Sequence, residues 1–402
     1  MKGLKIKIQA LLLCGVLITG LFSSCASDEN IDNGNKVNAG DKVLTLTLNT
    51  PKATTTCGAK TRVTNTDGTG SAENQINRLT IGIFASDGSV RTIQEITSGS
   101  TPAFTTASNI TTATITTNSL AAHDSVFVAV NAPVGTFNGV LTKDAFLKTI
   151  EIDAALTTKS DGTSSGNAEA MDNIPMFGKC DVAASGTHYT ADLSVSHLLA
   201  KITLAKITVA FDPTGSYSAA TFQPTSYFLI NVPNYLRFYD VGWGTGSTTT
   251  LWHGWADATS SSNPANTAYK EYLGTGPLAT QPVLTGTSTF LEPKNVFYTI
   301  PTSDATGVNN TKLVICGLFS PDGTSDAKKT VYYPVNINYV TSTQAAAEGT
   351  AKRVYANKNY TCNVTIKTKG ADTPTANLDP NDIDVKVTVT GFVNIDQDTT
   401  FE

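Results

Sequence analysis

The sequence predicts an all-β protein of two tandem β-sandwiches, on three observations. Short runs that alternate apolar and polar residues recur from residue 43 onward, separated by turns rich in Gly, Asn, Asp and Ser. The dominant polar residue is threonine, whose β-branched side chain suits the pleated surface of a sheet. The 402 residues exceed what one hydrophobic core usually holds, so the chain has room for two domains.

The expected elements follow in chain order. The first sandwich should hold strands at 79–84, 113–116 and 125–131, and apolar residues at near-helical spacing predict a short helix between Thr142 and Leu156. The pattern restarts near residue 190 with two long alternating runs. Later strands are expected at 227–232, 296–300, 312–316, 330–337, 360–366 and 383–390.

These runs divide the chain into five parts. We expect a signal peptide, a propeptide that holds a polar tether and one strand, an N-terminal sandwich, a C-terminal sandwich, and a linker with a final strand. Their residues are 1–25, 26–62, 63–190, 191–370 and 371–402, respectively.

The first 25 residues have the features of a bacterial export signal. Three lysines precede an apolar run, Ile8 to Phe22, that is too short for a comfortable membrane span. Small residues then precede Cys25, as in a lipobox, so we expect Cys25 to carry lipid. Acyl chains contribute about 0.8 kcal/mol per buried CH₂ and would hold the precursor on a membrane. The alternative is an ordinary secretory signal with an incidental cysteine.

Charge and motifs argue against an enzyme and against nucleic-acid binding. The net charge of −5 offers no basic surface, and the four histidines are scattered, which disfavours a His-rich metal site. The segment Gly162–Gly166 fits the G-x-S-x-G pattern of hydrolases, but its flanks are polar loop and not the required strand and helix. We therefore expect no catalytic residue, no metal and no cofactor.

Cysteine usage does not indicate a disulfide scaffold. Outside the signal and Cys25, four cysteines remain and none has a short spacing to another: Cys57, Cys180, Cys316 and Cys362. Cys316 and Cys362 both fall in predicted strands and could meet, but buried free thiols are the expected state.

Two strands at opposite ends of the chain share one pattern. Near the start, Leu44, Leu46 and Leu48 lie on one face of a strand whose other face carries threonines. The last strand alternates in the same way, with Ile383, Val385, Val387 and Val389 on one face. It either pairs within its own chain or serves as an arm for another copy, and the Pro/Asp/Asn-rich linker before it favours the arm.

Together these features resemble the FimA-type fimbrillins of Bacteroidales, the subunits of type V pili. The order and spacing of several stretches carry the resemblance, and they span almost the whole chain. They are the lipobox at Cys25, the early strand 43–49, Arg62, the stretches 79–84 and 125–133, His197 three residues before Ala200, and the segments 332–335 and 353–365.

The resemblance implies two transthyretin-like β-sandwich domains and a structural role in a surface fimbrium. In that family a trypsin-like protease cuts the lipoprotein after an arginine, or sometimes a lysine, in the first loop. The first strand then leaves, and the C-terminal strand of the next subunit replaces it. Carried over, this implies cleavage between Arg62 and Val63, a plug strand with Leu44, Leu46 and Leu48, and a donor strand with Ile383, Val385, Val387 and Val389.

The same resemblance implies the partners. These are other copies of the chain, accessory fimbrial subunits, the outer membrane through the lipid of the precursor, and a host or bacterial surface receptor. Lys60 and Arg78 compete with Arg62 as cut sites, but Arg78 adjoins a predicted strand and should be protected in the folded chain.

Two alternatives stay open. In the first, Trp243, Trp252 and Trp255 form an aromatic platform for a glycan on a monomeric surface lipoprotein, although such tryptophans equally anchor a long loop. In the second, the chain is an anchor subunit that keeps its first strand, or a tip subunit that donates none.

Overall fold

The structure is a computed structural model of the whole chain. It describes residues 42–50, 71–97, 103–107, 110–147, 149–151, 173–233, 235–238, 251–252, 278, 280–290, 296–302, 310–340, 343, 345–347, 349–376 and 383–391. By its internal contacts the chain divides into residues 1–36 and 37–402, and all the described residues fall in the second unit.

Strands dominate the described residues, as predicted. The first half holds β1 Lys42–Asn49, β2 Arg78–Phe84, β3 Val90–Thr97, β4 Phe104–Ala107, β5 Ile110–Thr117, β6 Ser125–Val130, β7 Thr149–Glu151, β8 Met176–Asp181, β9 Ala183–Ser185, β10 His188–Ser194 and β11 Ser196–His197. The second half holds β12 Ala200–Val209, β13 Thr221–Ile230, β14 Val232–Pro233, β15 Tyr235–Arg237, β16 Leu251–Trp252, β17 Leu284–Thr285, β18 Thr289–Phe290, β19 Val296–Thr299, β20 Lys312–Ser320, β21 Lys329–Asn336, β22 Lys358–Ile366 and β23 Ile383–Gly391.

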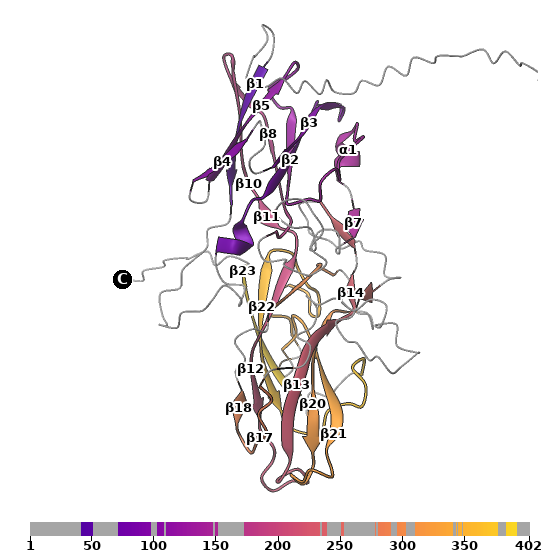
Figure 1. Cartoon of the computed structure of the whole chain (residues 1–402). Coiled ribbons are helices and arrows are strands. Elements are labelled where there is room, and N and C mark those ends of the chain that lie inside the picture. Colours follow the sequence, from indigo (N-terminus) through magenta and orange to yellow (C-terminus); the bar gives the residue numbers. More distant parts are fainter. Residues whose placement is uncertain are drawn as a thin grey trace, which may run out of the picture. The chain divides into compact units, whose positions relative to one another are not determined.

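Two sheets form what we call the first sheet pair. Their strand orders are β4-β5-β1-β10-β9 and β11-β8-β6-β2-β3. Figure 1 labels several of these strands, among them β1, β5 and β10. Apolar residues that alternate along the strands of both sheets meet in one core, to which β1 contributes its leucines and β2 and β6 contribute their odd- and even-numbered apolar residues, respectively. The pairings are antiparallel except that between β1 and β10, which is parallel.

In the sheet that contains β2 and β6, these two strands are buried on both faces. The second face of the sheet carries Phe84 and Phe127, which pack edge-on against Phe146 with ring centroids 5.6 and 6.0 Å away, respectively. Gly82 lies beneath these rings, and a Cβ there would stand 2.7 Å from Phe84 Cε2 and 2.8 Å from Phe146 Cε2. This two-sided burial explains why β6 reads as a continuous apolar run.

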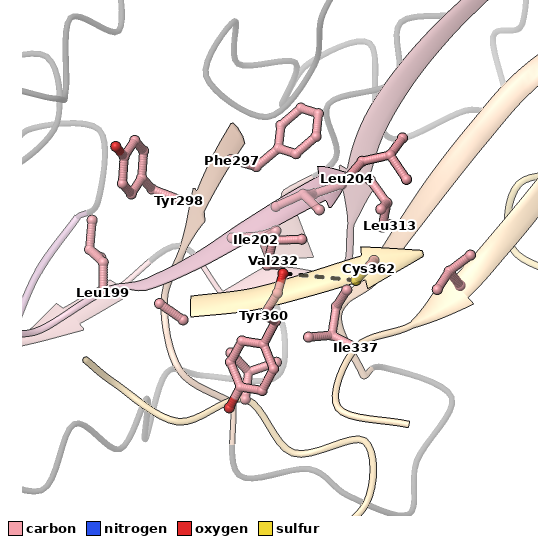
Figure 2. Close-up of a cluster of buried hydrophobic side chains, with 14 of the residues drawn as sticks. Leu199, Ile202, Leu204, Val232, Phe297, Tyr298, Leu313, Ile337, Tyr360 and Cys362 are labelled. Atoms are coloured by element: carbon pink, nitrogen blue, oxygen red, sulfur yellow. Dashed lines mark hydrogen bonds between the residues drawn. The ribbon is translucent and has the colours of Figure 1, made fainter. Parts of the chain in front are cut away.

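The second sheet pair consists of the orders β18-β12-β22-β23, with β19 also pairing β12, and β17-β13-β20-β21. Figure 2 shows part of its core, with Ile202 and Leu204 of β12 beside Cys362 of β22. The Cys362 thiol lies 3.9 Å from the carbonyl oxygen of Tyr360, and burial raises its pKa to about 12. Cys316 and Cys362 are both free, in agreement with the expectation.

One topology occurs twice in the chain. In the first sheet pair β1 lies between antiparallel β5 and parallel β10. In the second, β12 lies between antiparallel β18 and β19 on one side and parallel β22 on the other. The facing sheets repeat β2-β6-β8 as β13-β20-β21, all antiparallel. β12 therefore holds in the second pair the place that β1 holds in the first.

The helix expected between Thr142 and Leu156 is much shorter than predicted. It is α1, Lys143–Phe146, and the Thr142 hydroxyl caps it by accepting from Ala145 N at 3.2 Å. β7 follows and pairs with β15, since β-branched Thr149 and Ile150 favour an extended chain. A 3₁₀ helix, η1, spans Ser71–Asn74. No helix within the described ranges is long and apolar enough to cross a membrane.

The transition between the sheet pairs lies slightly later than residue 190. β10 runs through that position and still pairs with β1, and β11 pairs with β8. The second sheet pair begins with β12 at Ala200.

Candidate functional site

The place of β1 between β5 and β10, which we call the slot, is the candidate functional site. β1 has a paired neighbour along each of its two edges: β5 antiparallel over residues 42–49 and β10 parallel over residues 44–49 (Figure 1). Leu44, Leu46 and Leu48 are each 0% exposed, as the alternation predicted. β1 is thus an integral central strand in this structure.

Each leucine of β1 has its own surroundings in the slot. Leu46, in the middle, stands between Ala113 of β5 and Ala191 of β10, whose small side chains leave it lateral room. Leu44 stands between Ile115 and Tyr189. Full burial of three leucines contributes roughly 5–9 kcal/mol, as an upper estimate before ordering costs.

Polar contacts fix the two ends of β1. The Lys42 ammonium donates to the carbonyl oxygen of Leu120 at 2.7 Å and lies 5.3 Å from the centre of the Tyr189 ring. At the other end, the main-chain oxygen of Asn49 accepts from Val195 N at 3.1 Å. These contacts set the register of the strand in addition to its leucines.

The last strand, β23, occupies the edge of a sheet in its own chain. It pairs antiparallel with β22 along its length, and no other described strand pairs with it. Ile383, Val385 and Val387 are 3%, 2% and 5% exposed, whereas the side chain of Val389 lies outside the described residues. The first three residues of the face are buried as predicted, and the transfer of the strand to another copy stays a prediction.

The predicted cut site at Arg62 and Val63 lies outside the described residues, as do Cys25 and Lys60. The competing site Arg78 is described and is 1% exposed. Its Nε donates to the carbonyl oxygen of Ala132 at 2.8 Å, and the residue opens β2. A protease cannot reach Arg78 without unfolding β2, which agrees with the expected protection.

A buried polar cluster holds the segment around Glu73, which follows the predicted cut site in the sequence. We call it the Glu73 cluster: Glu73 of η1 with His197, Lys201 and Tyr298. Glu73 Oε1 lies 2.9 Å from the Lys201 ammonium and accepts from the Tyr298 hydroxyl at 2.5 Å. Sequence reasoning missed the cluster, because Glu73 lies in a short polar stretch without any periodicity. The one signal was the basic residue at position 197.

His197 completes the cluster through the main chain. Its Nε2 lies 2.9 Å from the carbonyl oxygen of Glu73, which can only accept, so Nε2 carries the proton. Nδ1 lies 3.3 Å from Oδ1 of Asn357. The residue is fully buried, and burial lowers its pKa from 6.5 to about 4, with the neighbouring Lys201 charge acting in the same direction.

The shifted pKa of His197 predicts acid sensitivity. Between pH 6.5 and 4 the unfolded chain binds a proton at this residue that the folded chain does not. The contribution of neutral His197 to the free energy of unfolding is therefore fully present above about pH 6.5. It falls toward pH 4, by up to about 3 kcal/mol. His197→Gln should flatten the dependence of the urea midpoint on pH between 7 and 4.5, whereas His188→Gln at an exposed position should not. An unchanged slope in His197→Gln would contradict the assignment.

Little of the predicted glycan platform lies within the described residues. Trp243 and Trp255 lie outside the described residues. Trp252 pairs through its backbone with Val232, but its side chain is not described. Within the described ranges, no group of three or more His, Cys, Asp or Glu side chains is arranged to hold a metal ion.

Comparison with known proteins addresses both sequence and fold. Residues 43–206 match the model of the family described as major fimbrial subunit protein (FimA). The structure is similar to a candidate cell adhesion protein from Bacteroides eggerthii, with a TM-score of 0.56 and 21% identity over 89% of this chain and 98% of that chain. A candidate cell adhesion protein from Parabacteroides distasonis gives 0.56 and 16%, over 87% of this chain and 99% of the other.

A fimbrilin, FimA, from Porphyromonas gingivalis has a TM-score of 0.55 and 15% identity, over 88% of this chain and 99% of that chain. No curated protein matches the sequence. At these identities the solved structures show a shared fold. The resemblance is thereby confirmed: residues 43–206 match the FimA family of major fimbrial subunits in sequence, and most of the chain shares the β-sandwich fold of a solved fimbrilin.

Proposed function

We propose that the chain is a structural subunit of a cell-surface fimbrium and polymerises by strand exchange. It is exported as a lipoprotein through Cys25 and anchored in the outer membrane as a precursor. A protease cuts after Arg62, β1 leaves with the lipid, and β23 of a second copy enters the slot. The mature sandwiches span 63–190 and 191–370, followed by the linker and donor strand at 371–402, and the course of β10 and β11 favours moving their boundary to Leu198 or Leu199.

The observation that supports this proposal most is the contrast between the two strands. β1 is paired along both edges, whereas β23 is paired along one. Removal of β1 would leave two unpaired edges and three apolar sites, a surface prone to association. A strand that enters restores both ladders, in the manner of β-augmentation.

Backbone pairing favours transfer of β23. Leaving β22 exposes Ile383, Val385 and Val387, and entering the slot buries the same side chains again. The apolar terms therefore nearly cancel. The second ladder is the surplus, at about 0.5–1.5 kcal/mol for each backbone hydrogen bond gained. Donor and acceptor are different surfaces, so the contact repeats in an open filament.

The contacts of residues 71–78 support a cut that would release β1 without loosening the rest of the chain. The Glu73 cluster holds η1. Just after it, Asn77 N donates to Asn131 Oδ1 at 2.9 Å, and Asn131 Nδ2 donates to Gln75 O at 2.8 Å. The chain is fixed by buried polar contacts from Glu73 onward, so the part that leaves ends before it.

Protein recovered from the cell surface provides the test. The wild type should begin at Val63 and form multimers that survive mild denaturant. Arg62→Ala should keep the lipidated N-terminus and stay monomeric, whereas Lys60→Ala should behave as the wild type. A chain without residues 383–402 should still be cut after Arg62 and remain a soluble monomer.

Two results would oppose the proposal. Filaments formed by the shortened chain would remove β23 as the donor. An uncut, lipidated N-terminus on wild-type surface protein would indicate an anchor subunit that keeps β1.

A further inference from the structure

We propose that the incoming β23 lies in the slot in the direction of β1, with Lys386 beside Asp192 of the receiving chain. In this register Ile383, Val385 and Val387 take the places of Leu44, Leu46 and Leu48. The inference rests on the proposed strand exchange and adds the register and the residue that selects it.

Alternation limits the registers to a few. A slip of one residue would turn the apolar face of β23 outward, so only shifts of two residues are allowed. In the direction of β1, two registers fill all three leucine sites. One uses Ile383, Val385 and Val387, and the other uses Val385, Val387 and Val389. A further shift would put Gly391 in the place of Leu48 and leave that site empty.

Side-chain volume favours the first register. Isoleucine has the volume of leucine, so Ile383 fills the Leu44 site between Ile115 and Tyr189. The second register places a valine at every leucine site, one methylene short each time. It also moves Ile383 to the place of Lys42, which is half-buried and pairs with β5 but not with β10.

Charge favours the same register. Opposite Thr45 and Thr47, the outward residues of β5 and β10 are threonines, with one exception, Asp192. Asp192 is exposed, stands beside Thr47 in the parallel pairing, and takes part in no ion pair among the described residues. Lys386 is exposed and is the single cation of β23. The first register puts it at the place of Thr47.

The other outward residue of the donor strand, Asp384, also has partners in the slot. Asp384 would take the place of Thr45, between Thr190 of β10 and Thr114 of β5, whose hydroxyl groups can donate to its carboxylate. Directly opposed unlike charges stabilise a strand pair. The first register opposes Lys386 and Asp192 in this way, whereas the second register places Thr388 beside Asp192 and Lys386 diagonally from it.

Disulfide formation with a cysteine at position 190 measures which residue of the donor strand lies beside it. Chains that carry Thr190→Cys together with Asp384→Cys should give a ladder of linked multimers on a non-reducing gel. Thr190→Cys with Lys386→Cys reads the register shifted by two residues and the reversed strand that has Val387 at the Leu44 site. Thr190→Cys with Thr388→Cys reads the reversed strand that has Val389 at the Leu44 site. Thr190→Cys alone controls for the native cysteines.

Charge reversal tests the selecting pair. Asp192→Lys and Lys386→Asp should each slow multimer formation roughly twofold to tenfold. The chain with both changes should recover, since every joint regains an unlike pair, and Asp181→Lys on the neighbouring sheet should have no effect. Ladders in the second or third cysteine chain, or no recovery in the double reversal, would overturn the register while leaving strand exchange intact. Absence of multimers in the wild type would instead overturn strand exchange itself.

Discussion

Replacing Leu46 by alanine is expected to lower the free energy of unfolding of the precursor by about 2–5 kcal/mol. The side chain is 0% exposed and stands between Ala113 and Ala191, so its neighbours are too short to close over the cavity. Thr45→Ala is the matched control, because Thr45 lies on the exposed face of the same strand and should change stability by at most about 0.5 kcal/mol. Urea unfolding of the uncut chain measures both.

The same substitution distinguishes a plug from an ordinary strand. If β1 leaves on maturation, the stability of assembled multimers should be identical for Leu46→Ala and the wild type, since residue 46 is no longer present. A loss of stability in the multimers as large as in the precursor would mean that β1 stays.

Replacing Lys201 by methionine is expected to destabilise the chain by about 3–5 kcal/mol. Methionine keeps most of the volume but leaves the buried Glu73 carboxylate without its cation, 2.9 Å away in the wild type. Lys206→Met is the matched control, on the exposed face of the same strand β12. Chemical unfolding monitored by circular dichroism measures the difference.

The stability lost in Lys201→Met should be partly recovered when Glu73 is replaced by glutamine, its neutral isostere. In Glu73→Gln with Lys201→Met no charge is buried, and the Tyr298 hydroxyl still has an acceptor. The double variant should therefore be more stable than Lys201→Met alone. Additive losses would indicate that the two side chains do not interact.

Strand positions on half-buried faces could be predicted from the sequence because period-two alternation dictates them. Leu44, Leu46 and Leu48 and the inward residues of β23 were found in this way. The start of β13 was missed, since it contains Pro224, which cannot donate to a ladder. The structure accommodates this proline beside a break in register between Pro224 and Ser226.

Buried charges could not be predicted in the same way. Lys201 stands in an alternating strand, where a lysine normally marks the solvent face, and Lys312 opens the mostly buried strand β20, yet they are 3% and 2% exposed. Their burial depends on partners remote in the sequence, such as Glu73 for Lys201 and the carbonyl oxygen of Ala376, 3.4 Å from the Lys312 ammonium. Only the tertiary fold brings these groups together.

The repeated topology sets the valence of the proposed subunit. β12 fills in the second sheet pair the position that β1 fills in the first, but it follows β11 after only Leu198 and Leu199, with no long segment in which a protease could cut. Each chain therefore opens one receptor and carries one ligand for it. Such units can extend in one dimension but cannot branch, and a single chain without a donor strand would end the polymer.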